Sequence, residues 1–304
     1  MGARSLDIPI SQIPTLVTLD WNLQRVRMPL VQQITSLKEK GVDTTSLEAD
    51  ILAPILVLEK EVERQLKKCV SNHPLWGYWL KHIVGIAEKF TGQLIYLITG
   101  KKHTDQCQKK RDKYFSKKKP GEKRVRAFKC ECPVMEIERF HSVSALWKYA
   151  GMNTVSYCRD CGKNVDEKAD SCTHCDSTNI GRRAPRRRRG QKVTWNPKLR
   201  MVCRNIGKSF VTNTSGQYRP YYEENKAFYN QKDPHLSDGH RDARARRKTV
   251  KLFLSHLYEM WYRMKDLEPP KTYAEEELGH VHHIPPPESE EAKKKEVKKA
   301  KEEE

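Results

Sequence analysis

Two C-x-x-C pairs, ten residues apart, constrain the fold of this chain more than any other feature of its sequence. The first pair is Cys158 and Cys161, and the second is Cys172 and Cys175. Gly162 follows the first pair, where a tight turn needs a residue without a side chain, and Asp176 follows the second. Two such turns present four thiolates in the arrangement that tetrahedral zinc requires. The sequence therefore predicts a small ribbon that holds one structural zinc ion, with these four cysteines as ligands.

Other uses of these cysteines fit the spacing less well. Disulfides belong to oxidising compartments, which nothing in the sequence indicates, and a redox site would need one pair beside a helix. Four thiolates also leave no open coordination position for catalysis. A second site remains an open alternative. His103, Cys107, Cys130 and Cys132 either close a basic loop around another metal ion or are free thiols with a chance C-x-C spacing.

The net charge is concentrated in two short segments. The chain has 58 Lys and Arg against 39 Asp and Glu, a formal net charge of +19. Residues 101–126 hold twelve basic residues against three acidic ones, and residues 181–200 hold nine basic residues and no acidic one. Clustered cations bind polyanions by neutralising phosphates, whereas ordinary solvated faces mix both signs. We therefore expect nucleic acid as the partner, against the alternatives of solvated loops or a scaffold whose charge only confers solubility.

The candidate phosphate-contacting residues lie in these segments, at the start of a long basic helix, and in a glycine turn. Gly85 precedes a helix predicted over 88–98, where backbone N–H groups would grip a phosphate as in a helix-hairpin-helix motif. The full set is Gly85, Lys109, Lys110, Arg111, Lys117, Lys118, Lys119, Arg182, Arg183, Arg186, Arg187, Arg188, Arg189, Lys192, Arg244, Arg246 and Arg247.

Apolar residues at three- and four-residue steps predict a mainly α-helical fold. Helices are predicted over 23–40, 44–69, 88–98, 197–212, 217–230 and 241–265. Pro54 should kink the second of them or split off its first turns. The first two helices form an N-terminal arm, which is either a pair of core helices or a coiled coil that joins two copies of the chain.

These elements divide the chain into five regions. They are a helical, coiled-coil-like arm (1–73), the first part of a helical core (74–156) with a basic insertion (101–135), the zinc ribbon (157–180), a basic linker with the second part of the core (181–268), and an extended Pro/His segment with a charged tail (269–304). No stretch approaches the ~18 apolar residues of a membrane span, and no signal sequence opens the chain. We expect a cytoplasmic protein with no membrane partner.

The order of several short motifs resembles a known family. Residues 138–152 read ERFHSVSALWKYAGM, which is similar to the R-F-x-S-x-x-x-L-x-x-Y-A-G-L signature in the C-terminal domain of insertion-sequence transposases of the IS-one-ten/one-sixteen type. Residues 195–200 look like that domain's G-N-x-x-L-R helix start, and residues 239–261 and 279–286 resemble a branch that carries a zinc ribbon. This resemblance implies a nucleoid-associated DNA-binding protein of transposition or recombination, with or without a guide RNA.

The catalytic parts of that family have no clear counterpart here. The resemblance implies a nuclease with four metal-binding acids, but only about 75 residues precede the matching region, and Asp20 is the single candidate for a strand-borne carboxylate. The family's serine nucleophile falls where the ribbon stands, and neither Ser156 nor Ser177 is followed by glycine. No catalytic residue is assigned, and strand transfer would need either a serine nucleophile in this chain or a partner nuclease. The alternative is a non-catalytic zinc-ribbon factor associated with RNA or chromatin.

Overall fold

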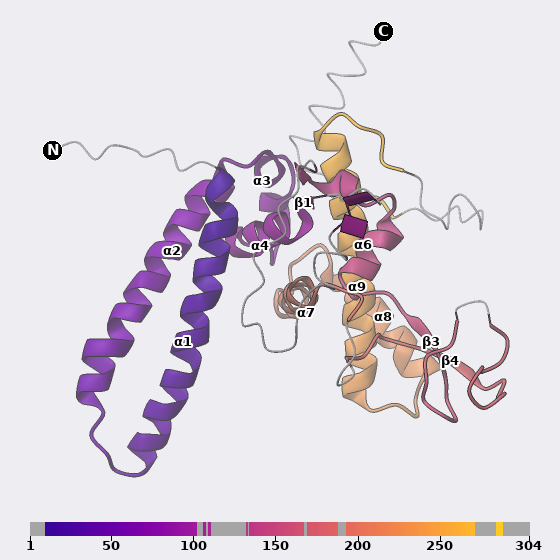
Figure 1. The fold of residues 1–304 in the computed structure, drawn as a ribbon, viewed down its shortest axis with the longest axis horizontal. Coiled ribbons are helices and arrows are strands. Elements are labelled where there is room, and N and C mark those ends of the chain that lie inside the picture. The colour runs from indigo at the N-terminus through magenta and orange to yellow at the C-terminus, as the bar shows by residue number, and fades with distance from the viewer. Residues whose placement is uncertain are drawn as a thin grey trace, which may run out of the picture.

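The computed structural model is mainly helical, as the sequence predicts. It describes residues 10–101, 106–107, 109–110, 132, 134–166, 169–187, 193–270 and 284–287. Figure 1 shows a long helical hairpin that projects from a body of packed helices. A small two-stranded ribbon lies on the other side of that body from the hairpin (Figure 1).

The arm is an antiparallel pair of helices. Its elements are a 3-10 turn (Ile10–Gln12), α1 (Ile13–Glu39), a π-helical turn (Leu47–Leu52) and α2 (Ala53–Ser71). Gly41 reverses the chain after α1 at φ +74°, a conformation that costs glycine little. The π-helical turn ends at Leu52, and Pro54 lies in the first turn of α2, where its missing N–H group costs least. The chain stays helical from Thr45 to Ser71, so the first turns differ from α2 in being π-helical and are not split off from it.

Helix α1 begins ten residues before the predicted start at residue 23, so that boundary was wrong. The added turns bury Ile13 and Val17, and Asp20 is only 1% exposed. The Lys89 ammonium binds the Asp20 carboxylate at 2.9 Å. A buried carboxylate is tolerated only with such a partner. Asp20 therefore occupies a core position while interrupting the apolar pattern, and it lies on a helix and not on the expected strand.

The body consists of six helices in the described part of the chain. They are α3 (Pro74–Tyr78), α4 (Glu88–Ile98), α6 (Val143–Tyr149), α7 (Pro197–Thr212), α8 (Arg219–Lys232) and α9 (Asp238–Met264), with 3-10 turns at Leu80–His82 and Ile137–Arg139. The bounds of α4 and α7 match their predicted ranges. Asn196 caps α7, because its side-chain oxygen accepts the N–H groups of Lys198 and Leu199 at 3.0 and 3.1 Å.

One apolar core joins the helices that precede the ribbon in the sequence with those that follow it. Phe253 of α9 lies at its centre, with its ring centroid 5.8 Å from Trp79, 5.4 Å from Phe210 and 5.6 Å from Tyr218. These four side chains are at most 2% exposed. Helices α3, α7 and α9 therefore pack as one body, and this packing fixes where the cations of α7 and α9 lie.

Two short antiparallel strand pairs complete the fold. Strand β1 (Gly100–Lys101) pairs with β2 (Val134–Met135), and β3 (Val155–Cys158) pairs with β4 (Ile180–Arg183). The first pair brings together the two ends of the basic insertion, and the second forms the ribbon, with Cys158 opposite Ile180. Among the described helices, none combines the length and apolarity that a membrane crossing needs.

Candidate metal centre and nucleic-acid interface

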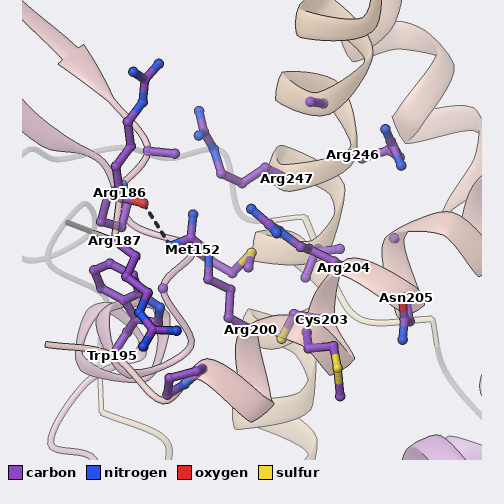
Figure 2. A pocket seen from close by; sticks show the side chains of 18 of the residues that line it. Met152, Arg186, Arg187, Trp195, Arg200, Cys203, Arg204, Asn205, Arg246 and Arg247 are labelled. Atoms are coloured by element: carbon purple, nitrogen blue, oxygen red, sulfur yellow. Dashed lines mark hydrogen bonds between the residues drawn. The ribbon is translucent and has the colours of Figure 1, made fainter. Parts of the chain in front are cut away.

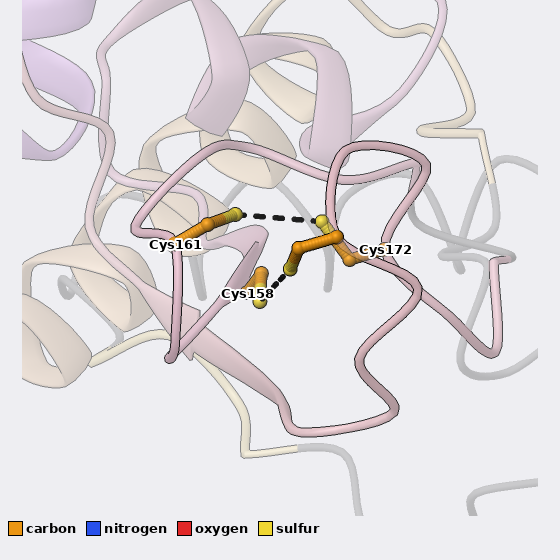
Figure 3. A group of neighbouring side chains, drawn as sticks. Cys158, Cys161 and Cys172 are labelled. Carbon is orange, nitrogen blue, oxygen red and sulfur yellow. Dashed lines mark hydrogen bonds between the residues drawn. The ribbon is translucent and has the colours of Figure 1, made fainter.

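The four predicted cysteine ligands lie together at the end of the ribbon (Figure 3). Their sulfur atoms all lie within 4.8 Å of one another. The sulfur of Cys158 is 3.6 Å from that of Cys175, and the sulfur of Cys161 is 3.5 Å from that of Cys172. A disulfide would bring two sulfurs to about 2.05 Å. Four sulfurs bound to one zinc ion at about 2.3 Å lie about 3.8 Å apart. The arrangement is therefore compatible with one metal site.

A left-handed residue after each C-x-x-C pair lets the backbone turn back. Gly162 has φ +70° and Asp176 has φ +54°. Glycine adopts this region freely, and aspartate enters it more readily than most residues. The Gly162 N–H donates to the Cys158 carbonyl at 3.0 Å, and the Asp176 N–H donates to the Cys172 carbonyl at 2.8 Å. The expected turn at Gly162 is confirmed.

A carboxylate that sequence reasoning missed ties the two cysteine turns together. Asp160 accepts hydrogen bonds from the Ser177 hydroxyl and, at 3.0 Å, from the Asn179 side-chain amide. These two donors hold the pKa of Asp160 below its ordinary value. The Ser177 hydroxyl also accepts the Asn179 N–H at 3.0 Å. The residue types suit such a network, but their spacing alone does not show that they meet.

Two of the clustered thiols, Cys158 and Cys175, have pKa values shifted in opposite directions. The Cys161 N–H donates to the Cys158 sulfur and lowers the pKa of Cys158 to about 6. The Ser177 N–H lowers the pKa of Cys175, but the thiols of Cys158, Cys161 and Cys172, with burial, raise it to about 12. A cation bound among the sulfurs would stabilise all four thiolates, because metal binding replaces their protons.

The second predicted metal site lies only partly within the described residues. Cys107 and Cys132 are described and half-buried, whereas His103 and Cys130 lie outside the described residues. Within the described part of the chain, the ribbon cysteines are the group of His, Cys, Asp or Glu side chains whose geometry suits a metal ion. Both alternatives for Cys107 and Cys132 stay open.

A cleft of about 980 Å³ opens between α7, α9 and the segment that leaves β4. Seven of its lining residues are cationic, namely Arg186 and Arg187 after β4, Arg200, Arg204 and Lys208 on α7, and Arg246 and Arg247 on α9. We call these seven residues the arginine cleft. Figure 2 shows the side chains of Arg200, Arg204 and Arg247 converging from the two helices. Within the described residues, the lining contains no Asp or Glu.

The cations of the arginine cleft repel one another. Burial lowers the pKa of Arg200, and the charges of Arg204 and Arg247 lower it further. Burial also lowers the pKa of Arg247, together with the charge of Arg244. The Nε atom of Arg200 has no hydrogen-bond partner among the described residues. Like charges gathered in a cleft favour the binding of an anion, which relieves the repulsion.

Two motifs that are distant in the sequence meet at the rim of the arginine cleft. The Asn196 N–H donates to the Tyr149 carbonyl at 2.8 Å, and the Asn196 amide donates to the Tyr149 hydroxyl at 2.9 Å. Gly151 has φ +65°, and a Cβ atom there would lie 2.9 Å from the Trp195 ring. The guanidinium group of Arg200 lies over the Trp195 ring, 4.8 Å from its centroid. Gly151 therefore allows Trp195 to support Arg200.

Four residues of the predicted nucleic-acid-binding set line the arginine cleft, namely Arg186, Arg187, Arg246 and Arg247. Arg183 instead packs on the ribbon, with its guanidinium 4.1 Å from the Tyr157 ring. Arg244 pairs with Asp233, while Arg182, Lys109 and Lys110 are exposed elsewhere. Seven predicted residues lie outside the described residues, namely Arg111, Lys117, Lys118, Lys119, Arg188, Arg189 and Lys192.

Gly85 belongs to a turn that attaches α4 to α7. It has φ +93°, and its carbonyl accepts the Ser209 hydroxyl at 2.7 Å. The N–H of Val84 donates to the Gln217 side chain at 3.1 Å, and the N–H of Ile86 donates to the Ile83 carbonyl at 3.0 Å. These two N–H groups are engaged within the protein, and Gly85 is not among the described residues that line the cleft.

The predicted set lacked the three cations that α7 contributes. Arg200, Arg204 and Lys208 recur at four-residue steps, which places them on one face of a helix. The four-residue spacing of these cations is visible in the sequence. That they form a cleft depends on α9 packing beside the same face of α7, which the periodicity of α7 does not reveal.

The two candidate serine nucleophiles lie in the ribbon and not in the cleft. Ser156 is 7% exposed on β3. The hydroxyl of Ser177 donates to Asp160 and so helps to hold the ribbon together. Neither serine is among the described residues that line the arginine cleft.

Comparison of the chain with protein-family models, with curated proteins and with solved structures gives no match. The resemblance to transposases therefore stays an expectation from the sequence.

Proposed function

We propose that this protein binds nucleic acid and that the arginine cleft grips its phosphates. The observation that carries this proposal is the lining itself, with seven cations and, within the described residues, no acidic side chain. Guanidinium groups form strong paired hydrogen bonds to phosphate oxygens. Arg187 and Arg204 are exposed, so a phosphate chain reaches them without rearrangement of the core.

Zinc is the metal that we propose for the ribbon cysteines, in a structural role. Four thiolates complete a tetrahedral shell and leave no position for a substrate. Strand β4 ends at Arg183, and the next residues, Ala184 to Arg187, line the arginine cleft. A zinc ion that fixes the ribbon would therefore hold Arg186 and Arg187 at the cleft.

Mobile-element DNA is the finer proposal for the ligand, with a role in transposition or recombination at the nucleoid. Its support is the meeting of two motifs behind the transposase resemblance, because Tyr149 and Asn196 bond to each other at the rim of the cleft. A guide RNA would be compatible with the same phosphate contacts. In this proposal strand cleavage comes either from a serine nucleophile of this chain or from a partner nuclease.

A non-catalytic nucleic-acid-binding factor is the second candidate. It is favoured by the lining of the cleft, which within the described residues holds no Ser, His, Asp or Glu. These are the side chains that act as nucleophiles, bases or magnesium ligands in strand cleavage. Supercoiled plasmid incubated with the protein and Mg²⁺ separates the two candidates. A covalent protein–DNA adduct that disappears in Ser156→Ala or Ser177→Ala would favour the transposase.

We also propose that the arm joins two copies of the chain. Several apolar side chains on it are between 38% and 67% exposed, namely Leu19, Val26, Met28, Val57 and Leu58. A second arm would remove this surface from water. Sedimentation should show a dimer for the native protein and a monomer for Val26→Lys/Val57→Lys. A native monomer at all concentrations would contradict the proposal.

The test of nucleic-acid binding removes four exposed cations of the arginine cleft. The variant is Arg186→Ala/Arg187→Ala/Arg204→Ala/Lys208→Ala. Its matched control removes four exposed cations from the arm, as Arg25→Ala/Lys40→Ala/Lys60→Ala/Lys68→Ala. Both variants lose the same charge. Fluorescence anisotropy with labelled DNA should show that the cleft variant binds roughly tenfold more weakly or worse, while the control changes little. Equal losses would mean that overall charge, and not the cleft, drives binding.

A further inference from the structure

A second cationic surface adjoins the arginine cleft on α8 and α9. At its centre is Phe228 of α8, which is 46% exposed and lies outside the apolar core. The Nζ atom of Lys232 lies 5.2 Å from the centroid of the Phe228 ring, and that of Lys248 lies 5.5 Å away. Both lysines are exposed. We call Phe228, Lys232 and Lys248 the aromatic platform.

The aromatic platform and the arginine cleft share helix α9. Arg247 lines the cleft, and Lys248 of the platform is the next residue. Lys251 lies one turn further along the helix, and its pKa is lowered by burial and by the charges of Arg247 and Lys248. The three cations therefore lie within electrostatic reach of one another. A chain of phosphates that leaves the cleft at Arg247 passes the platform.

The fold alone gives little reason for this exposed ring. Tyr229 contacts Phe228 edge to face at 5.3 Å and so orients the ring, but almost half of Phe228 stays exposed. Lysine stems do cover apolar surface, yet a lysine over an exposed ring stabilises a fold only weakly. An exposed aromatic ring beside cations is the combination with which proteins bind unpaired nucleotides.

We infer that the aromatic platform stacks an unpaired nucleobase of the nucleic acid whose phosphates occupy the arginine cleft. This inference rests on the proposed function and adds that the ligand contains a single-stranded segment. Bases inside a duplex are covered by their neighbours, so only an unpaired base offers its face to Phe228. In the free protein the ammonium groups of Lys232 and Lys248 lie over the ring, so the incoming base displaces them, and they then bind the phosphates that flank the stacked base.

The test compares three labelled probes, namely a single strand, the blunt duplex of the same sequence, and that duplex with a single-stranded overhang. The variants are Phe228→Ala and Phe228→Trp, with Leu58→Ala as control, because Leu58 is also 46% exposed but lies on the arm. Phe228→Ala should bind the single strand and the overhang about tenfold more weakly, with the blunt duplex unchanged. Phe228→Trp should keep full affinity, and its added tryptophan fluorescence should fall when the single strand binds.

The outcomes separate this inference from the proposed function. If Phe228→Ala binds the single strand as well as the native protein does, or loses all three probes equally, the platform does not stack a base. If the four-cation cleft variant loses binding at the same time, the proposed function still stands. If the native protein binds none of the probes, both proposals are wrong.

Discussion

The ribbon and the arginine cleft both gather groups of like charge, but the ribbon gathers them around one point and the cleft around an open space. In the ribbon, four sulfur atoms within 4.8 Å face one point, and the carboxylate of Asp160 is matched by two donors. In the cleft, seven cations surround an open space of about 980 Å³; Arg246 pairs with Asp242, and the described lining itself holds no acidic side chain. A closed shell suits a permanent ion, whereas an open one suits a large anion that binds and leaves. We base the proposed structural role of the ribbon and the proposed binding role of the cleft on this contrast.

Removal of two ribbon ligands should have the largest effect. Cys158→Ser/Cys172→Ser leaves only two thiolates, too few for a structural zinc site, so metal analysis should fall from one zinc per chain to none. Nucleic-acid affinity should fall in part, because Arg186 and Arg187 lose their support while the cations of α7 and α9 stay. Full zinc content in this variant would refute the metal site. Unchanged affinity for nucleic acid would show that the ribbon does not hold Arg186 and Arg187 in position at the cleft.

A side chain at residue 151 should damage the cleft through the backbone. Gly151→Ala forces a Cβ atom into the left-handed region and toward Trp195, which lies 2.9 Å from that position. The conformational cost is about 1–2 kcal/mol. Urea unfolding should therefore show lower stability, together with weaker nucleic-acid binding. The control is Gly77→Ala, where a Cβ atom meets nothing within 4 Å, and stability should hold or rise. Equal stability in both variants would contradict this role of Gly151.

Loss of the carboxylate that links the cysteine turns should have the smallest effect. Asp160→Ala removes the acceptor of the Ser177 and Asn179 bonds but keeps all four thiolates. We expect bound zinc to stay near one per chain and to pass to a competing chelator several times faster. The control is Asp170→Ala, an exposed acid in the same ribbon. Identical release rates in the two variants would show that the Asp160 network does not support the site.

The ribbon was predictable because its determinants are local. All four cysteines fall within residues 158–175, and Gly162 marks its turn in the sequence itself. The Asp160 network was not predictable, since its partners Ser177 and Asn179 reach it only after the two turns have folded over each other.

The cleft was predictable only in parts. The sequence indicated a basic segment after the ribbon and a basic start to the last helix, and both contribute to the lining. Their meeting with Arg200, Arg204 and Lys208 depends on the packing of α7 and α9 around Phe253, which a charge pattern does not contain. The start of α1 was not predicted for a related reason. Asp20 is buried and paired with Lys89, so a charged residue occupies a core position and interrupts the apolar pattern there.

The salt dependence of DNA binding tests the central claim most directly. Each phosphate contact lowers the slope of log Kobs against log salt concentration by about 0.9. If the arginine cleft holds the phosphates, Arg186→Ala/Arg187→Ala/Arg204→Ala/Lys208→Ala should flatten the native slope by about 3.6. The four-cation arm control should keep the native slope. A cleft variant whose slope equals that of the native protein would show that these residues make no phosphate contacts and that nucleic acid does not bind in the cleft.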